Sequence, residues 1–559
     1  MAFKWVEIIY LSELFFYVGF FIWDVIKHNY LIVNGLWFFI LPFFYYTLWL
    51  PWGIDMTDEG YNLALSWYGS SLSMMDIFYY STEGGYLIMH YWLKLLGHPY
   101  LLWYRIGSAI IWAFFVWIVA NLFSHNFLFR GFTIVFFVIL SSMAVWLNRL
   151  YNFIIPYNLF PVLFFAVSLF FIFKKDDKLL ILSGLFLIWS FFARFSFIVF
   201  VFLFPIFFYK SFRKVLYFVV GYFIGLILFI FLGGNLRMFF SAIWHTLSGV
   251  YSYGLCILTD KSHSFVSIFH SYIKDFAVVF FIVVILLIFK IISRWIKGLW
   301  MQLLAVVFIA ILLSKSSISD YLIVLSVYAY LSLYGIYLII KKKQVFNIFL
   351  VFVLLLLLLI SFFGTNTGLK SILFNGSFLV FIGFLGKVLS DEKSFLRWAV
   401  ILSSFLLLFT IYGKLNYVYR DYSYSHLTKE FSLSNLKGIY TTKRKVYLIE
   451  RMVNVMNLYS IDNQYIVVNK PLLLTVISEH RPYSICWSVS ADSFKRIKPA
   501  FVIFSKISLR SYDWDKNRRS FFELERKNLE AILNILRNDY ISVDNIDDRI
   551  IFYKRISKM

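Results

Sequence analysis

Long apolar runs, separated by short clusters of lysine and arginine, limit most strongly how this chain can fold. The run at 34–52 is typical, because about 19 helical residues extend about 28 Å, close to one hydrocarbon core. The chain of 559 residues is 61% hydrophobic and 15% charged, with a mean hydropathy of +0.78. A soluble globular chain has about 45–50% apolar and about 25% charged residues. The sequence therefore predicts a polytopic α-helical membrane protein.

The apolar runs predict about thirteen membrane spans, counted from residue 34. We expect them at 34–52, 101–123, 132–147, 157–173, 179–193, 195–209, 215–232, 276–289, 299–313, 321–340, 345–363, 371–389 and 398–413. The net charge of +22 does not indicate nucleic-acid binding, because the basic residues gather between apolar runs as the positive-inside rule describes. The apolar run at 8–23 contains Glu13 and lacks a small-residue cleavage site, so we expect no cleavable signal peptide. This run is either an interfacial helix or an additional span.

The composition divides the chain into two parts. Residues 1–413 are expected to form the membrane part, with long outer loops at about 53–100 and 233–272. The odd number of spans places 414–559 outside the membrane, where charged residues become frequent. In that region we expect strands at 465–468, 501–504, 540–543 and 550–553, and helices at 441–458 and 521–536. The sequence thus predicts a C-terminal extracytoplasmic α/β domain of about 140 residues with its own core.

Three carboxylates follow the first expected span within five residues: Asp55, Asp58 and Glu59. A carboxylate at the bilayer centre costs about 2.5–3.5 kcal/mol, so these groups belong in a polar pocket at the outer membrane face. Asp58 and Glu59 are the catalytic candidates, able to deprotonate an acceptor hydroxyl or amine or to hold a metal ion. Alternatively, Thr57 or Asp58 simply caps a surface helix that starts at Glu59. Glu83 is a second acidic candidate for substrate binding, or else a loop or cap residue.

Basic residues at the expected outer ends of spans are candidates for binding a lipid phosphate or a sugar. They are Arg105, Arg149, Arg194, Arg237 and Lys370, joined by His245 in the second outer loop. Arginine suits bidentate phosphate contacts, whereas each residue singly is also explained by snorkelling towards the interface. No histidines have metal-ligand spacing, so we assign no metal ligand and no cofactor, although a divalent metal is compatible with the acidic loop.

Two cysteines, Cys256 and Cys486, are too few for a disulfide framework. The expected topology places both outside, where one bond between them can form. The chain has no P-loop, no GxGxxG after a strand and no GxSxG. These absences argue against an ATP-driven pump and against a hydrolase of that type.

Five sequence segments together resemble a known family of membrane enzymes. They are Asp58-Glu59-Gly60-Tyr61, Tyr91-Trp92-Leu93-Lys94-Leu95-Leu96-Gly97, Tyr104-Arg105-Ile106-Gly107-Ser108-Ala109, Ser183-Gly184-Leu185 and Ala193-Arg194-Phe195-Ser196. With an acidic pair after the first span and two long outer loops, the chain resembles the GT-C glycosyltransferases, in particular the protein O-mannosyltransferases and lipid A aminoarabinose transferases. The resemblance covers the architecture of the whole chain and is most specific at 50–210.

The resemblance implies an enzyme that takes a sugar from a polyprenyl-phosphate donor and passes it to a glycan, lipid or protein acceptor at the outer face of a bacterial inner membrane. It implies Asp58 as general base, assisted by Glu59, and Arg105, Arg194 and Arg237 as phosphate contacts. The chain departs from the family at Gly84-Gly85-Tyr86-Leu87, where relatives often have Pro-Pro-Leu. That departure leaves the structure of the loop open, and no role is carried onto Lys94.

Other functions fit parts of the same pattern. A flippase or transporter of lipid-linked glycans also has many spans and buried charges, but more often has internal repeats and helices broken at the bilayer midplane. An O-antigen-type polymerase or ligase would use outer arginine and histidine residues without the acidic pair. A non-catalytic scaffold would act through the residues from Lys414 onward.

Overall fold

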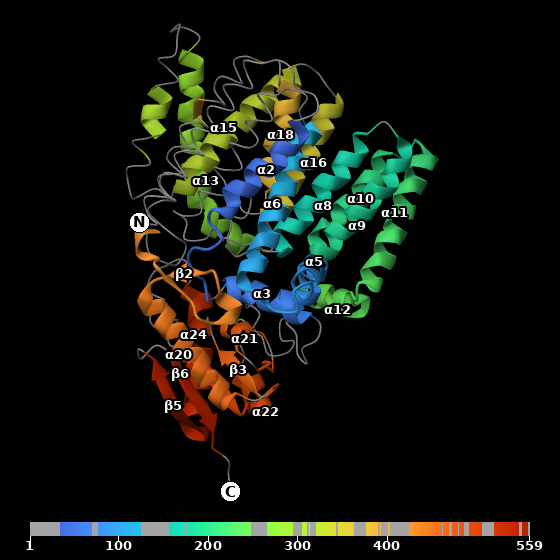
Figure 1. Cartoon of the computed structure of the whole chain (residues 1–559). Coiled ribbons are helices and arrows are strands. Elements are labelled where there is room, and N and C mark those ends of the chain that lie inside the picture. The colour runs from blue at the N-terminus through green and yellow to red at the C-terminus, as the bar shows by residue number, and fades with distance from the viewer. Residues whose placement is uncertain are drawn as a thin grey trace.

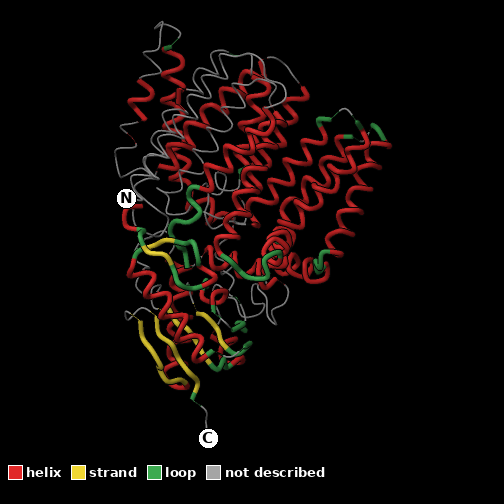
Figure 2. Tube along the Cα trace, in the orientation of Figure 1, coloured by secondary structure: helices red, strands yellow, loops and turns green. Residues whose placement is uncertain are grey.

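The computed structural model shows a helical bundle, a layer of short helices across one end of it, and a small α/β region beyond that layer (Figure 1). Figure 2 shows that the strands are confined to the C-terminal part of the chain. The structure describes residues 34–56, 58–69, 77–123, 156–174, 176–208, 210–247, 265–293, 304–309, 312, 320–341, 345–362, 376–389, 392, 401–402, 424–460, 462–468, 472–478, 480–483, 485, 491–505, 519–546 and 550–556.

The bundle consists of long apolar helices that run roughly side by side (Figure 1). They are α2 (Asn34–Thr47), α6 (Leu101–Phe123), α8 (Pro156–Ile172), α9 (Leu180–Ala193), α10 (Ile198–Phe207), α11 (Phe212–Phe231), α13 (Phe265–Ile292), α15 (Asp320–Lys341), α16 (Val345–Phe362) and α18 (Ser377–Leu389). Short 3-10 turns, η2 (Asp177–Leu179) and η3 (Phe195–Phe197), precede α9 and α10. Within the described chain, two stretches are long and apolar enough to cross a membrane, Leu101–Asn121 and Phe212–Phe231.

Small residues allow α9 and α11 to pack with their backbones in close approach. A methyl group added at Gly221 would collide with the carbonyl oxygen of Ile181, and one at Gly184 with that of Phe218. Gly221 and Gly225 have the GxxxG spacing that brings membrane helices together. The opposite side of α11 exposes large apolar side chains, with Phe231 83% exposed, as expected of a helix that faces lipid.

The layer at the end of the bundle contains α3 (Asp58–Tyr68), α4 (Ile77–Tyr80), α5 (Glu83–Lys94) and α12 (Leu236–Leu247). These helices lie across the direction of the bundle helices (Figure 1). Helices α3, α4 and α5 all lie within the first expected outer loop at 53–100. The layer stacks on the bundle through tryptophans: Trp92 of α5 and Trp103 of α6 have ring centroids 4.3 Å apart. Each indole N–H of this pair donates to the other residue's carbonyl oxygen.

The C-terminal region is built on a four-stranded mixed sheet in the order β3-β4-β6-β5. Its strands are β3 (Tyr465–Val468), β4 (Phe501–Ser505), β5 (Tyr540–Ile546) and β6 (Ile550–Arg555). Its helices are α20 (Lys443–Tyr459), α21 (Leu474–Ile477), α22 (Ala491–Ile497) and α24 (Arg519–Asp539), accompanied by β1 (Lys429–Glu430), β2 (Tyr440–Thr441), η4 (Tyr424–His426) and η5 (Ser434–Leu436). All four predicted strands and both predicted helices of this region are present, within a few residues of the expected bounds.

The two faces of this sheet belong to different cores. Ile466 and Val502 point to one face, which packs with Ile532 of α24 in a small separate core. The alternate residues Val467 and Ile503 belong to the large core that continues into the helical bundle. The α/β region therefore has a small core of its own on one face, and with the other face it contributes to the large core of the helical bundle.

The α/β region is joined to the chain directly after α2. Trp52 and Tyr440 form a parallel β-bridge, and their rings lie 5.3 Å apart. The Lys445 ammonium donates to the carbonyl oxygen of Ile54 at 2.8 Å, and the Leu473 amide donates to that of Met56 at 3.0 Å. The contacts hold residues 51–56 between the bundle and the C-terminal region.

Two expected bounds are wrong, and several expected spans are not described. Helix α2 ends at Thr47 and a turn follows, so it is shorter than the run expected at 34–52. Helix α13 begins at Phe265, so the second outer loop does not extend to 272. Helix α18 begins at Ser377, after Gly376 with its left-handed φ of 78°, and residues 371–375 of that expected span are outside the described residues. The spans expected at 132–147 and 398–413 and the run at 8–23 lie mostly or wholly outside the described residues. Thirteen spans stay a prediction.

Gly60 provides a test of this junction. A methyl group at Gly60 would overlap the backbone nitrogen of Leu473, so Gly60→Ala must push α3 and α21 apart. Overpacking of this kind costs about 1–3 kcal/mol. We expect a clear fall in the thermal unfolding temperature of the purified protein. Gly97→Ala is the matched control, because Gly97 has open space around it and pays only for its left-handed backbone; an equal fall in both variants would contradict the tight junction.

Candidate functional site

The acidic segment after α2 folds into a reciprocal cap at the start of α3. The Asp55 carboxylate accepts hydrogen bonds from the backbone amides of Asp58, at 2.9 Å, and Glu59, at 3.2 Å. In return, the Glu59 carboxylate accepts from the Asp55 amide at 3.3 Å. A side chain that satisfies the first amides of a helix is a stabilising N-terminal cap. The capping side chain is thus Asp55, and the helix begins at Asp58 rather than Glu59; Thr57 lies outside the described residues.

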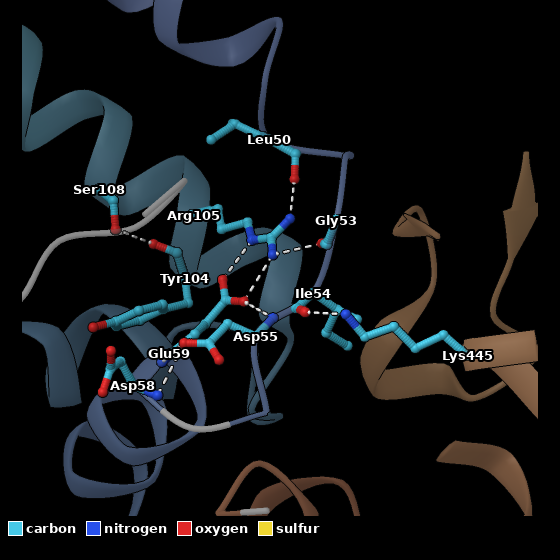
Figure 3. Close-up of polar contacts among 10 residues, drawn as sticks. All are labelled: Leu50, Gly53, Ile54, Asp55, Asp58, Glu59, Tyr104, Arg105, Ser108 and Lys445. Carbon is cyan, nitrogen blue, oxygen red and sulfur yellow. Dashed lines mark hydrogen bonds and ion pairs between the residues drawn. The ribbon is translucent and has the colours of Figure 1, made fainter. Parts of the chain in front are cut away.

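Glu59 forms a buried ion pair with Arg105 at the start of α6 (Figure 3). The two guanidinium–carboxylate distances are 2.6 Å and 2.8 Å, and both side chains are 2% exposed or less. Arg105 also donates to the carbonyl oxygens of Leu50 and Gly53. One guanidinium therefore holds the end of the α2 segment, the turn after it and the first turn of α3.

The electrostatics of the pair indicate that Glu59 and Arg105 hold this geometry. Burial raises the pKa of the Glu59 carboxyl above its ordinary value, while the guanidinium of Arg105 acts in the opposite direction. Four of the five Arg105 N–H groups already donate within the protein, which leaves little capacity for a ligand phosphate. The pair is suited to positioning its neighbours rather than to transferring a proton.

Asp58 is placed differently from Glu59. It is half-buried, and its carboxylate points away from the Glu59–Arg105 pair (Figure 3). Its backbone carbonyl oxygen accepts a 2.7 Å hydrogen bond from the side-chain amide of Asn62, one turn further along α3. The positive end of a helix favours a negatively charged carboxylate. Of the two predicted catalytic residues, Glu59 forms the ion pair with Arg105 and Asp58 does not.

Helices α3 and α5 run parallel to each other, in register. The Tyr86 hydroxyl donates to the Asn62 side chain at 2.9 Å, and His90 Nδ1 lies 2.9 Å from the Ser66 carbonyl oxygen. Both contacts join residues 24 positions apart, one helical turn after the other. The first turns of the two helices therefore lie at the same end, which brings Asp58 and Glu83 into one neighbourhood.

Glu83, the first residue of α5, is fully buried. One carboxyl oxygen accepts from the Asn235 amide at 3.0 Å, which ties the first outer segment to the start of α12. The other oxygen, Oε1, is buried and has no hydrogen-bond partner among the described residues. Burial raises the pKa of the Glu83 carboxyl to about 7.

The remaining predicted site residues divide into three groups. Arg194 is buried directly after α9, at the tip of the predicted hairpin. Arg237 is exposed on α12, and His245 lies on the same helix with a side chain that the structure does not describe. Arg149, Lys370, Cys256 and Cys486 are outside the described residues. No three His, Cys, Asp or Glu residues in the described ranges are grouped so that they could hold a metal ion.

Sequence reasoning missed two parts of this arrangement. The capping role of Asp55 was not predicted, although its spacing before Asp58 and Glu59 is that of a helix cap. Lys445, which fixes Ile54, is 391 residues away from it, so no local pattern could have revealed the contact.

The fold and the site define a helical protein with candidate membrane-spanning helices and a buried acidic–basic centre where its α/β region docks. No protein-family model matches the chain, and a search of curated proteins finds no match either. The interpretation of the site therefore depends on its own geometry and chemistry.

The buried pair makes a stability prediction. Glu59→Gln leaves the buried Arg105 guanidinium without its counter-charge, and Arg105→Met leaves the buried Glu59 carboxylate without its own. Each change should lower the free energy of unfolding by about 3–5 kcal/mol. We expect both variants to unfold at clearly lower temperature than the wild type. The double variant should lose less than the two single losses added together, as a double-mutant cycle would measure. Arg213→Met, at an exposed arginine, is the control; strict additivity of the two changes would refute the coupling.

The raised pKa of Glu83 predicts that the free energy of unfolding depends on pH. Its folded pKa of about 7 exceeds the ordinary value of 4.5, so the folded state binds the proton more tightly than the unfolded state. The resulting stabilisation is complete below about pH 4.5, falls as the pH rises towards 7 and is absent above that, a change on the order of 3 kcal/mol. Glu83→Gln should flatten this part of the profile in thermal unfolding measured from pH 4.5 to 8. A profile that Glu83→Gln leaves unchanged would show that another group titrates.

Proposed function

We propose that this chain is a multi-pass membrane glycosyltransferase that moves a sugar from a polyprenyl-phosphate donor to an acceptor outside the membrane. The observation that carries the proposal is the placement of Asp58: a half-buried carboxylate at a helix N-terminus, between the end of an apolar bundle and a docked α/β region. A lipid-linked donor presents its phosphate at such a boundary. The resemblance of 50–210 to GT-C enzymes supports the same reading.

Transfer of the sugar requires few protein groups, and this end of the bundle contains groups of each kind. The acceptor hydroxyl or amine attacks the anomeric carbon, the bond from that carbon to the phosphate oxygen breaks, and polyprenyl phosphate leaves with the electron pair. Asp58 takes the acceptor proton as general base, a role worth about 10²–10⁴-fold. Phosphate is already a good leaving group, so the remaining needs are a cation beside it and a dry site.

The candidate phosphate contacts are Arg194 and Arg237. Arg194 is buried at the end of α9 that meets α5, and Arg237 is exposed in the first turn of α12. Arg105 is a weaker candidate, because four of its five N–H groups already donate within the protein. In this scheme Glu59 assists by positioning, because with Arg105 it sets the direction in which α3 presents Asp58.

The proposed topology follows the apolar pattern. About thirteen spans would cross a bacterial inner membrane, with α3, α5, α12 and the α/β region on the outer face. Arg237, exposed beside Phe240 and Trp244 on α12, is typical of a helix at a membrane interface. The docking of residues 440–473 against 52–60 supports a role for the α/β region in holding the acidic segment in place.

The proposal is tested with purified protein in nanodiscs and a panel of radiolabelled polyprenyl-phosphate sugars and acceptors. We expect at least one donor to be consumed by the wild type, and Asp58→Asn to lower that rate by at least about 10²-fold with an unchanged unfolding temperature. Asp492→Asn, which alters an exposed carboxylate in the first turn of α22, should leave the rate unchanged.

Two results would contradict the transferase. One is the absence of turnover with every donor; the other is turnover that Asp58→Asn does not alter. Transport of a lipid-linked glycan across a sealed vesicle, unaffected by Asp58→Asn, would favour the flippase alternative instead.

A further inference from the structure

Around the start of α5 lie three buried polar atoms that have no hydrogen-bond partner among the described residues. They are Glu83 Oε1, Asn158 Oδ1 and Ser196 Oγ. A buried polar group that lacks a partner costs about 1–3 kcal/mol, so such atoms are uncommon in native proteins. Three of them in one region of the described chain make that region a candidate for ligand binding.

The packing of α5 places the three residues in one region of the fold. A methyl group at Gly84 would contact the backbone of Phe192 and Ala193, three residues before Ser196. A methyl group at Gly85 would contact the backbone of Pro156, two residues before Asn158. The first turn of α5, which begins with Glu83, is therefore wedged between the end of α9 and the start of α8.

The register between α8 and α9 gives the same result independently. These helices are antiparallel, with Ser168 and Ser183 hydroxyls 2.7 Å apart and the rings of Phe164 and Trp189 5.9 Å apart. Continued towards the end layer, this register places Asn158 level with the residues that follow Ala193. Ser196 follows at that level, and Figure 1 shows α5 across these helix ends.

The chemistry of the cluster selects its ligand. A carboxyl oxygen, an amide oxygen and a hydroxyl together accept and donate hydrogen bonds in several directions, as neighbouring hydroxyl groups require. Stacked aromatic rings, Tyr79 and Tyr86, lie on the same segment and supply an apolar side. A metal ion is disfavoured, because Glu83 is the only carboxylate among these groups and Arg194 is buried two residues before Ser196.

We infer that Glu83, Asn158 and Ser196 form a binding site for a polyhydroxylated group, the sugar ring of the donor. The inference rests on the proposed function for the identity of the ligand and on the unpartnered atoms for the site. Asn62 and Tyr86 connect this site to the first turn of α3, so the bound sugar lies in the neighbourhood of Asp58.

The test compares lipids with and without a sugar. Binding of bare undecaprenyl phosphate and of undecaprenyl phosphate carrying mannose, glucose, galactose or arabinose is measured on the full chain in nanodiscs. We expect the wild type to prefer one glycosylated lipid over the bare lipid. Ser196→Ala and Asn158→Ala should each reduce that preference about fivefold and leave the affinity for bare lipid unchanged. Ser190→Ala is the matched control, because this buried serine of α9 already donates to Leu187.

The outcomes separate this site from the transferase itself. A sugar preference that Ser196→Ala and Asn158→Ala both leave intact, or no preference in the wild type, overturns the site even if donors turn over. A rise in unfolding temperature with calcium or sodium chloride, lost in the same variants, assigns a cation instead and also overturns it. Loss of the preference for the glycosylated lipid in these variants supports the sugar site, even where no transfer is detected. The absence of transfer would refute only the proposed transferase. Ser196→Cys, with a polar group of similar size, serves where Ser196→Ala does not fold.

Discussion

The ion pair between Glu59 and Arg105 is the interaction on which the rest of this structure depends. Two full charges are removed from water, and only dense hydrogen bonding compensates a desolvation that costs several kcal/mol for each ion. Arg105 achieves this by gathering the carbonyl oxygens of Leu50 and Gly53 as well as the carboxylate. The same contacts fix where the chain leaves α2 and how α3 begins, and the α/β region docks on the turn so formed.

The helices of the end layer place several polar side chains at the end of an otherwise apolar bundle. Because α3 and α5 are parallel, the partial positive charges of two helix N-termini lie together, and each has a carboxylate in its first turn. The two acids nevertheless differ: Asp58 is half-buried, whereas Glu83 is fully buried and bound to the start of α12. A difference of environment of this kind is what gives two similar groups separate chemical roles.

Local patterns predicted much of the fold and rather less of the site. The strands at 465–468 and 501–504 were predictable because a short apolar run between polar residues is typical of a buried strand. Helix α6 was predictable because its 23 residues are predominantly apolar and long enough for a membrane-spanning helix. The acidic segment was predicted as a candidate site, but the partners of its members were not predicted. Arg105 is 46 residues from Glu59, and Asn235 is 152 residues from Glu83, so their pairing depends on how the helices pack.

The shared core between the sheet and the bundle has a consequence for how the protein is made. Ile54 reaches the ribosome exit long before Lys445, its partner 391 residues later in the chain. At about 5–20 residues per second, the acidic segment waits about 20–80 s for the contacts that secure it. Until then this end of the bundle is an incomplete surface, because the sheet residues that share its core, such as Val467 and Ile503, have not yet been made. Maturation of the site is thus timed by the last quarter of translation.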